Sequence, residues 1–247
     1  MKSIIEYFKQ FRGMMYFYFM GYIIRGLTPL IGTAVCVVTL IALLLFIGGA
    51  EFLPHIIIGT LTALVFGSGM SQLSVDINGL TLSRFKYMLV SSPVNPLVYA
   101  FGAATGMSFV TLLLVIPLFI FYLVIVKPSL SAIAITIAML LILWVTGITM
   151  GFTISLRIRE PIRLMSITDI IYSLLVYVMP VYYPIEILPE YIWPVTYISP
   201  VTHVALMLRS ITGVSSVHIT LMNWIIPFIY LAIFTFIAAY KAQWREK

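Results

Sequence analysis

The sequence predicts an all-α membrane protein with six transmembrane helices, and three observations lead to this fold class. The chain of 247 residues is 62% hydrophobic and only 9% charged. Apolar runs of roughly 17 to 25 residues recur along it, each long enough to cross the hydrocarbon layer of a bilayer. A proline-rich stretch before the last run cannot form one continuous helix. We expect one transmembrane domain over residues 1–247, without a separate soluble domain.

Residues 1–25 are expected to form an amphipathic helix at the membrane interface. Apolar residues between Ser3 and Arg12 fall largely on one helical face, namely Ile4, Ile5, Tyr7, Phe8 and Phe11. Charged and amide residues fall largely on the other, a pattern typical of a helix that lies on the membrane surface. The aromatic residues of 14–24 suit the same interfacial zone. A solvated tail remains the alternative.

Six spans follow, with boundaries near 29–48, 53–75, 97–126, 131–156, 164–183 and 223–240. Pro117 is expected to kink the third span, because proline removes a helical hydrogen bond. Two small-residue motifs, Gly102-x-x-x-Gly106 and Gly147-x-x-x-Gly151, predict places where helices approach closely.

Basic residues predict the orientation. If the N-terminus is inside, every Lys and Arg except Lys127 and Arg209 falls on the inner side. This bias indicates a multi-pass protein of the cytoplasmic (plasma) membrane with both termini cytoplasmic. The net charge of +6 therefore reflects membrane topology rather than nucleic-acid binding.

The longest inner loop, 76–96, predicts a docking element. Asn78 could cap a short helix from Gly79 to about Val90 that carries an apolar ridge and basic flanks. The residues concerned are Leu82, Arg84, Phe85, Lys86 and Leu89. Such a helix suits contact with a cytoplasmic partner protein, while a connector on the membrane surface remains the alternative.

An outward re-entrant hairpin and loop are expected at 184–222, between spans five and six. Prolines at 180, 184, 189, 194 and 200 permit only short broken helices there. Irregular backbone at membrane depth survives only where protein or a water-filled cavity satisfies its polar groups. The candidate residues of this outer lid are Pro184, Glu186, Pro189, Glu190, Pro200 and His203.

These segments together resemble the membrane permease subunits of type-2 ATP-binding-cassette (ABC) transporters. The resemblance covers essentially the whole chain, and its most specific part is Pro184-Ile-Glu-Ile-Leu-Pro189 followed by Tyr197-Ile-Ser-Pro200-Val-Thr202-His203. The family usually shows Asn-Pro-Leu-Thr where this chain has Ser199-Pro200-Val201-Thr202. Serine also caps a helix that begins with proline, so the departure preserves the architecture.

The resemblance implies an exporter of an amphipathic, drug-like or lipid-linked substrate, with polysaccharide or glycolipid export as the alternative. Two permease copies, most simply a homodimer, would pair in the membrane and dock on a separate cytoplasmic ATPase. The chain has no G-x-x-x-x-G-K-[ST] phosphate loop, so ATP and Mg²⁺ would bind that partner and not this chain, which is not expected to be an enzyme. Spans two and five would line the pathway. Their candidate pathway residues are Phe66, Met70, Tyr172, Tyr177 and Met179, for which ordinary packing is the alternative role.

Other polar residues predict structural roles. Asp169 lies near the inner interface and is expected to pair with Arg163, Arg159 or Arg25 rather than to relay protons. The histidines, together with Glu186 and Glu190, lack the compact spacing of a metal site. A serine nucleophile at Ser68 would need a nearby base, so the triplet 67–69 is better explained by helix packing.

Three rival functions have characteristic requirements. A membrane-embedded enzyme needs a cluster of catalytic groups at one depth, and the sequence does not predict such a cluster. An ion-coupled carrier is expected to show inverted repeats with discontinuous helices, and no clear repeat relates the two halves. A membrane scaffold without transport activity would have no ATPase partner.

Overall fold

The computed structural model describes residues 4–25, 28–82, 91, 94–158, 160–215 and 219–241. Its α-helices are α1 (Ile4–Arg25), α2 (Thr28–Gly48), α3 (Leu53–Leu82), α5 (Pro96–Val126), α6 (Leu130–Ser155), α7 (Pro161–Ser173), α8 (Trp193–Thr196), α9 (Pro200–Ile211) and α10 (Leu221–Lys241). No β-strand occurs among the described residues. The predicted all-α class is confirmed.

Four helical segments are long and apolar enough to cross a membrane, namely Ile31–Gly48, Ala50–Ser71, Leu130–Ser155 and Leu221–Tyr240. The two halves of α5, Pro96–Phe109 and Thr111–Val126, make a fifth if they count as one bent span. Segments of this length and composition are consistent with a multi-pass membrane protein.

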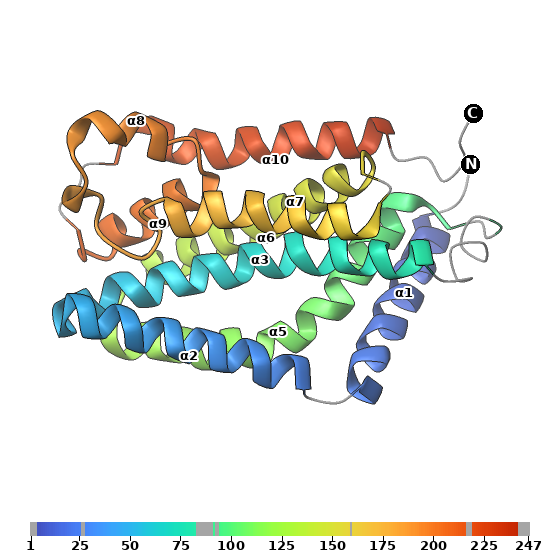
Figure 1. Cartoon of the computed structure of the whole chain (residues 1–247), viewed down its shortest axis with the longest axis horizontal. Coiled ribbons are helices and arrows are strands. Elements are labelled where there is room, and N and C mark those ends of the chain that lie inside the picture. Colours follow the sequence, from blue (N-terminus) through green and yellow to red (C-terminus); the bar gives the residue numbers. More distant parts are fainter. Residues whose placement is uncertain are drawn as a thin grey trace.

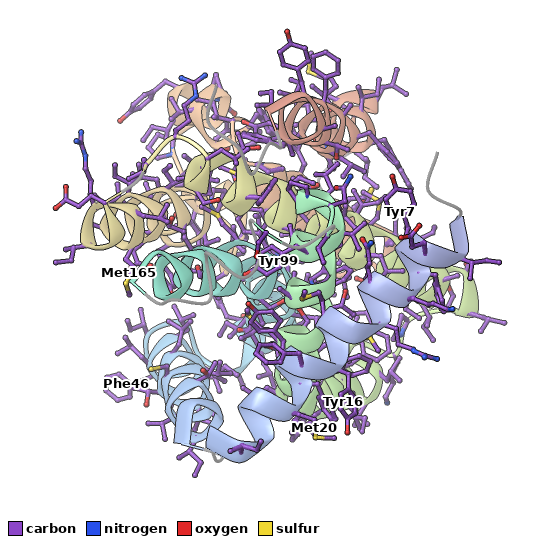
Figure 2. The ribbon with its side chains drawn as sticks, turned by 90° about the vertical axis from the view of Figure 1, so that its right-hand side faces the viewer. Tyr7, Tyr16, Met20, Phe46, Tyr99 and Met165 are labelled. Atoms are coloured by element: carbon purple, nitrogen blue, oxygen red, sulfur yellow. The ribbon has the colours of Figure 1, made fainter. Side chains whose placement is uncertain are left out.

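The long helices run roughly along the long axis of the molecule, whereas α1 crosses one end of it (Figure 1). The end of α10 and the turn between α6 and α7 lie at that same end. The α5–α6 turn, α8 and α9 lie at the opposite end (Figure 1). Viewed from the α1 end, α1 lies in front of the bundle, with Tyr99 of α5 behind it (Figure 2). Helix α3 occupies the centre, where it packs against α5, α6, α7 and α9.

Both glycine motifs lie at close helix crossings, as predicted. A Cβ on Gly147 in α6 would lie 2.5 Å from the carbonyl oxygen of Phe66 in α3. A Cβ on Gly106 in α5 would lie 2.5 Å from the carbonyl oxygen of Met15 in α1. Because real Cβ atoms essentially never approach backbone so closely, only glycine permits these helix separations.

The first predicted helix, over residues 1–25, is one continuous element in the structure, α1. In the structure, only part of its predicted apolar face packs against another helix. The backbone of Phe11 contacts Gly102 of α5, whereas Ile5 and Phe8 are exposed. This partial packing arises because α5 covers the side of α1 that carries Phe11, Met14 and Tyr18.

The bend in α5 is not at Pro117, where we predicted it. The two halves of the helix meet at 58° between Phe109 and Thr111, upstream of the proline. The halves pack against different partners, since Gly106 contacts α1 and Tyr122 bonds Thr136 of α6. These two sets of contacts, rather than the missing N–H of proline, account for the position of the bend.

Helix α3 continues beyond its predicted end near residue 75. It runs through Asn78 to Leu82, so Asn78 lies inside the helix and the predicted N-cap is wrong. Nothing at this point interrupts the chain strongly enough to end the helix, because a single interior glycine at Gly79 weakens a helix without breaking it. The predicted docking residues Arg84, Phe85, Lys86 and Leu89 lie outside the described residues.

The predicted fifth span, 164–183, ends earlier than expected. Helix α7 runs directly into a π-helical segment, Leu174–Val178, and Met179 then adopts extended backbone angles. Met179 precedes Pro180, and the proline ring disfavours a helical conformation in the residue before it. Residues 179–183 therefore belong to the irregular segment that follows.

Replacing Gly147 with alanine is expected to destabilise the protein, because the new Cβ would meet the backbone of α3. Overpacking of this kind typically costs about 1–3 kcal/mol. The matched control is Gly13→Ala in α1, where nothing lies within 4 Å of the new Cβ. Thermal unfolding in detergent, followed by size-exclusion chromatography, should show a lower midpoint for Gly147→Ala only. Equal midpoints for both variants would contradict the close-packing interpretation.

Candidate functional site

Three tyrosines form a ladder along one side of the π-helical segment. Tyr172 and Tyr177 pack edge to face with ring centroids 5.7 Å apart, and Tyr177 stacks on Tyr182 at 5.9 Å. Residues five apart point in different directions on an α-helix. The wider π turn, which bonds residue i to i+5, brings Tyr172 and Tyr177 to the same side. The local helix geometry thus assembles the ladder.

The ladder lines a groove of about 490 Å³ between α2, α3 and the α7–π segment. Side chains with hydroxyl or thiol groups join the tyrosines there, namely Thr33, Cys36, Thr39 and Thr60. Aliphatic residues of α2 and α3 complete the wall, and none of the described lining residues is charged. Such a surface can contact an uncharged amphipathic molecule through aromatic faces and scattered hydroxyls.

The predicted pathway residues divide between this groove and the core. Tyr172 and Tyr177 line the groove. Phe66 is buried behind it and stacks on Tyr172, with ring centroids 6.3 Å apart. Met70 lies at the crossing of α3 with α6, and Met179 packs in the hydrophobic core. The sequence reasoning missed the threonines of α2, whereas the five-residue spacing of Tyr172, Tyr177 and Tyr182 was visible in the sequence.

The hairpin between α7 and α10 contains two 3₁₀ turns, Ile185–Ile187 and Glu190–Ile192, followed by α8 and α9. Ser199 is the N-cap of α9, and its Oγ accepts a hydrogen bond from the backbone N–H of Thr202, as the Ser-Pro sequence predicted. The same hydroxyl donates to the carbonyl oxygen of Leu175 at 2.7 Å. Ser199 therefore connects the hairpin to the π-helical segment that carries Tyr177 of the ladder.

The predicted lid residues occupy two different environments. Glu186, Pro189 and Glu190 are exposed, and Pro184 is half-buried. Pro200 and His203 are buried in α9.

His203 belongs to a local hydrogen-bond network. Its Nε2 donates to the carbonyl oxygen of Tyr197 at 2.8 Å, and its Nδ1 lies 2.9 Å from Asn223 Oδ1. The imidazole therefore joins the hairpin to α10 and faces away from solvent.

The structure reveals a residue that the sequence reasoning had treated only as an outward-facing charge. Arg209 of α9 is 0% exposed. Its Nη1 donates to the carbonyl oxygens of Pro180 at 3.1 Å and Tyr183 at 2.9 Å. Its Nη2 donates to the carbonyl oxygens of His55 at 3.3 Å and Val181. One guanidinium thus connects α9, the proline-rich turn and the start of α3.

A sequence signal for this role did exist. Prolines cannot donate backbone hydrogen bonds, so a proline-rich turn leaves carbonyl oxygens without the partners that a helix would supply. A guanidinium has five N–H donors in a fixed fork and can satisfy several carbonyls at once. The sequence could not show which cation would do so.

Asp169 and Arg163 are not brought together by the structure. Six residues along a helix rotate the side chains by about 240°, which places them on different faces of α7. Both side chains are exposed. Arg163 instead lies with Arg157 and Glu160 around a pocket at the α6–α7 turn.

The remaining polar candidates also lie apart. No group of three His, Cys, Asp or Glu side chains able to hold a metal occurs in the part of the chain that the structure describes. His218 lies outside the described residues. Ser68 donates to the carbonyl oxygen of Val65, and His55 lies thirteen residues earlier in the same helix, about 20 Å away. Gly69 packs against the backbone of Trp144, which supports the packing explanation of residues 67–69.

No protein-family model matches the sequence, and no curated protein matches it either.

Replacing Arg209 with methionine is expected to loosen the hairpin. The substitution leaves up to four carbonyl oxygens without their donor, and a buried unsatisfied acceptor costs about 1–3 kcal/mol. Hydrogen–deuterium exchange should become faster in 184–199, and the thermal midpoint in detergent should fall. Arg163→Met, on the exposed face of α7, is the control and should change neither. Unchanged exchange in the Arg209 variant would show that other contacts hold the hairpin.

Proposed function

We propose that this chain is the membrane permease subunit of an ATP-driven exporter of the type-2 ABC class. It would move an amphipathic, drug-like or lipid-linked substrate across the cytoplasmic membrane, with ATP hydrolysed on a separate subunit. The observation that carries the proposal is the groove lined by tyrosines and threonines. This groove runs along the central helix α3. The folded hairpin lies at one end of the bundle, and the transverse helix α1 lies at the other.

The proposed topology has six spans, formed by α2, α3, α5, α6, α7 with its π-helical segment, and α10. Residues 161–178 make the shortest of these spans, with a length of about 27 Å. Helix α1 would lie in the inner interface, which its position across the bundle end supports (Figure 2). The hairpin would dip into the outer leaflet. Arg157 and Arg163 lie in the α6–α7 region, near the proposed cytoplasmic end. Lys127 lies in the α5–α6 turn at the opposite end, and this distribution agrees with the positive-inside rule.

A second copy would complete the pathway. Helix α2 forms one wall of the groove, yet none of its most apolar stretch, Ile31–Gly48, is buried within the chain. Val38 and Phe46 are among its exposed apolar residues. A homodimer that brings two such grooves together would enclose a passage, whereas a single copy leaves the groove open on one side.

The groove chemistry also suits the second candidate substrate class, polysaccharides and glycolipids. Aromatic faces can pack against sugar rings, and the threonine and tyrosine hydroxyls can exchange hydrogen bonds with sugar hydroxyls. The same chemistry disfavours an ion-coupled carrier, because coupling ions need charged or converging carbonyl ligands. None of the described residues that line the groove is charged.

Affinity purification of the tagged permease in nanodiscs should recover a nucleotide-binding ATPase subunit together with ATPase activity. Replacing Arg84 and Phe85 with alanine should remove that subunit, because both residues belong to the predicted docking loop. The control is Lys127→Asn in the α5–α6 turn, at the opposite end of the molecule. Asn is chosen because Lys127 has a positive φ of 48°.

If the unmutated permease is recovered alone and without associated ATPase activity, the transporter proposal is contradicted. That result would favour a carrier or a scaffold. An ATPase that stays bound to the Arg84 and Phe85 variant would keep the transporter proposal and overturn only the docking site.

Changing Pro189 and Pro200 to alanine is expected to reduce transport more than assembly. Proline fixes φ near −65°, and its loss costs about 0.4–1 kcal/mol per site, too little to unfold the protein. The hairpin would gain alternative conformations and hold its position less well. Uptake into inside-out vesicles and recovery of the ATPase subunit should be compared with Pro128→Ala, outside the hairpin. Equal transport by all variants would contradict a lid role for the hairpin.

A further inference from the structure

A second cavity, of about 450 Å³, lies between α3, α5 and α6. Its lining includes Val65 of α3, Val115 and Phe119 of α5, and Leu140 and Trp144 of α6. It shares no residue with the tyrosine groove, which faces a different flank of α3. This cavity therefore needs its own explanation, apart from the proposed pathway.

Two hydrogen bonds join α5 to α6 along the cavity, one beyond its end near the α5–α6 turn and one within its wall. Toward the α5–α6 turn, the Tyr122 hydroxyl lies 2.9 Å from Thr136 Oγ1. On the other side, Trp144 Nε1 donates to Ser108 Oγ at 2.8 Å. Thr136 and Trp144 are eight residues apart in α6, a rise of about 12 Å. Between these bonds α5 bends by 58°, which separates it from α6.

The cavity opens sideways, toward the outside of the bundle. Ile116, Ile137 and Leu141 lie at its rim and are 53%, 47% and 57% exposed. The floor is formed by Val65 and Ser68 of α3. A ligand must therefore enter laterally, between α5 and α6.

The polar groups in the cavity wall have partners within the chain. Ser68 donates to Val65 O at 2.8 Å, Thr105 donates to Phe101 O at 2.7 Å, and Ser108 accepts from Trp144. The fourth hydroxyl residue, Thr111, also has an interaction of its own. None of the described lining residues is charged.

This chemistry defines the class of occupant. Ligand pockets usually place a few polar groups to orient the ligand, whereas the hydroxyls here already have partners within the chain. A water molecule needs two to four polar partners, and this mostly aliphatic and aromatic wall offers few. An empty cavity of this size would forfeit the dispersion contacts of its walls. The occupant must be apolar along the whole length of the cavity.

We propose that this cavity binds one acyl chain of a membrane phospholipid. The rim belongs to α6 and to the bent helix α5, which are apolar enough to cross a membrane, so lipid tails surround the opening. A chain that enters sideways fills the space left by the α5 bend and meets no unsatisfied polar group. The site requires that the chain spans a membrane, but it does not require the permease function.

Fluorescence quenching of Trp144 by brominated lipid tests the proposal. The protein contains four tryptophans. In a background with Trp193, Trp224 and Trp244 changed to phenylalanine, Trp144 alone reports on the cavity. The protein is reconstituted in phosphatidylcholine vesicles whose acyl chains carry bromine at mid-chain. Bromine quenches tryptophan only at short range, so an acyl chain in the cavity should quench Trp144 strongly.

Two matched variants distinguish a chain in the cavity from lipid outside it. Val115→Phe fills the cavity from α5 and should abolish most of the quenching. Val124→Phe makes the same change on the exposed outer part of α5, away from the cavity, and should leave the quenching unchanged. If the Val115 variant is not recovered, Leu112→Phe at the exposed rim of the cavity replaces it.

Quenching that is equal in the Val115 and Val124 variants would show contact with bulk lipid only and would overturn the proposal. Absence of quenching in the parent protein would show that protein, such as a second copy of the chain, covers the cavity. That result would also overturn the proposal, while leaving the ATPase experiment unaffected.

Discussion

The buried guanidinium of Arg209 is the interaction on which the hairpin end of the structure depends. The turn at 179–184 contains two prolines and no regular hydrogen-bond pattern, so its carbonyl oxygens need donors from elsewhere. Arg209 supplies them and connects the turn to α3 through the carbonyl of His55. Burying a cation that bonds no carboxylate is unfavourable. The four carbonyl dipoles offset this cost only if they converge closely on the guanidinium. Gly59 permits that convergence, because a Cβ there would collide with Val181 O.

Helix α3 has a comparable role along the rest of the bundle. Glycines in α3 and α6 bring these two helices into backbone contact, and Gly59 does the same for the turn. Close contact on these sides leaves two flanks of α3 incompletely covered. One flank faces the tyrosines of the α7–π segment and the threonines of α2. The other carries apolar side chains, with hydroxyls already bonded, beside α5 and α6. Two cavities of similar size thus present different chemistry to their occupants.

The sequence predicted those features that depend on local patterns. Apolar runs gave most helix boundaries within a few residues, since length and composition determine where a span can form. The cap at Ser199 and the glycine crossings followed from residue type and spacing. Predictions that depended on tertiary partners were less successful. The bend in α5 reflects its contacts with α1 and α6, and the role of Arg209 reflects carbonyls in segments distant in the chain. Neither partner can be read from a single stretch of sequence.

The tyrosine groove and the hairpin are mechanically connected, and Ser199 is the point of connection. Its hydroxyl caps α9 and also donates to Leu175 O, inside the π-helical segment. A π turn is less favourable than an α turn and persists where surrounding contacts support it. Displacement of the hairpin would withdraw this hydrogen bond and remove one reason for the wider turn. Because Tyr177 faces Tyr172 only through that turn, the shape of the groove depends on the position of the hairpin. The fold therefore connects the hairpin end of the bundle to the wall of the groove through the hydrogen bond of Ser199.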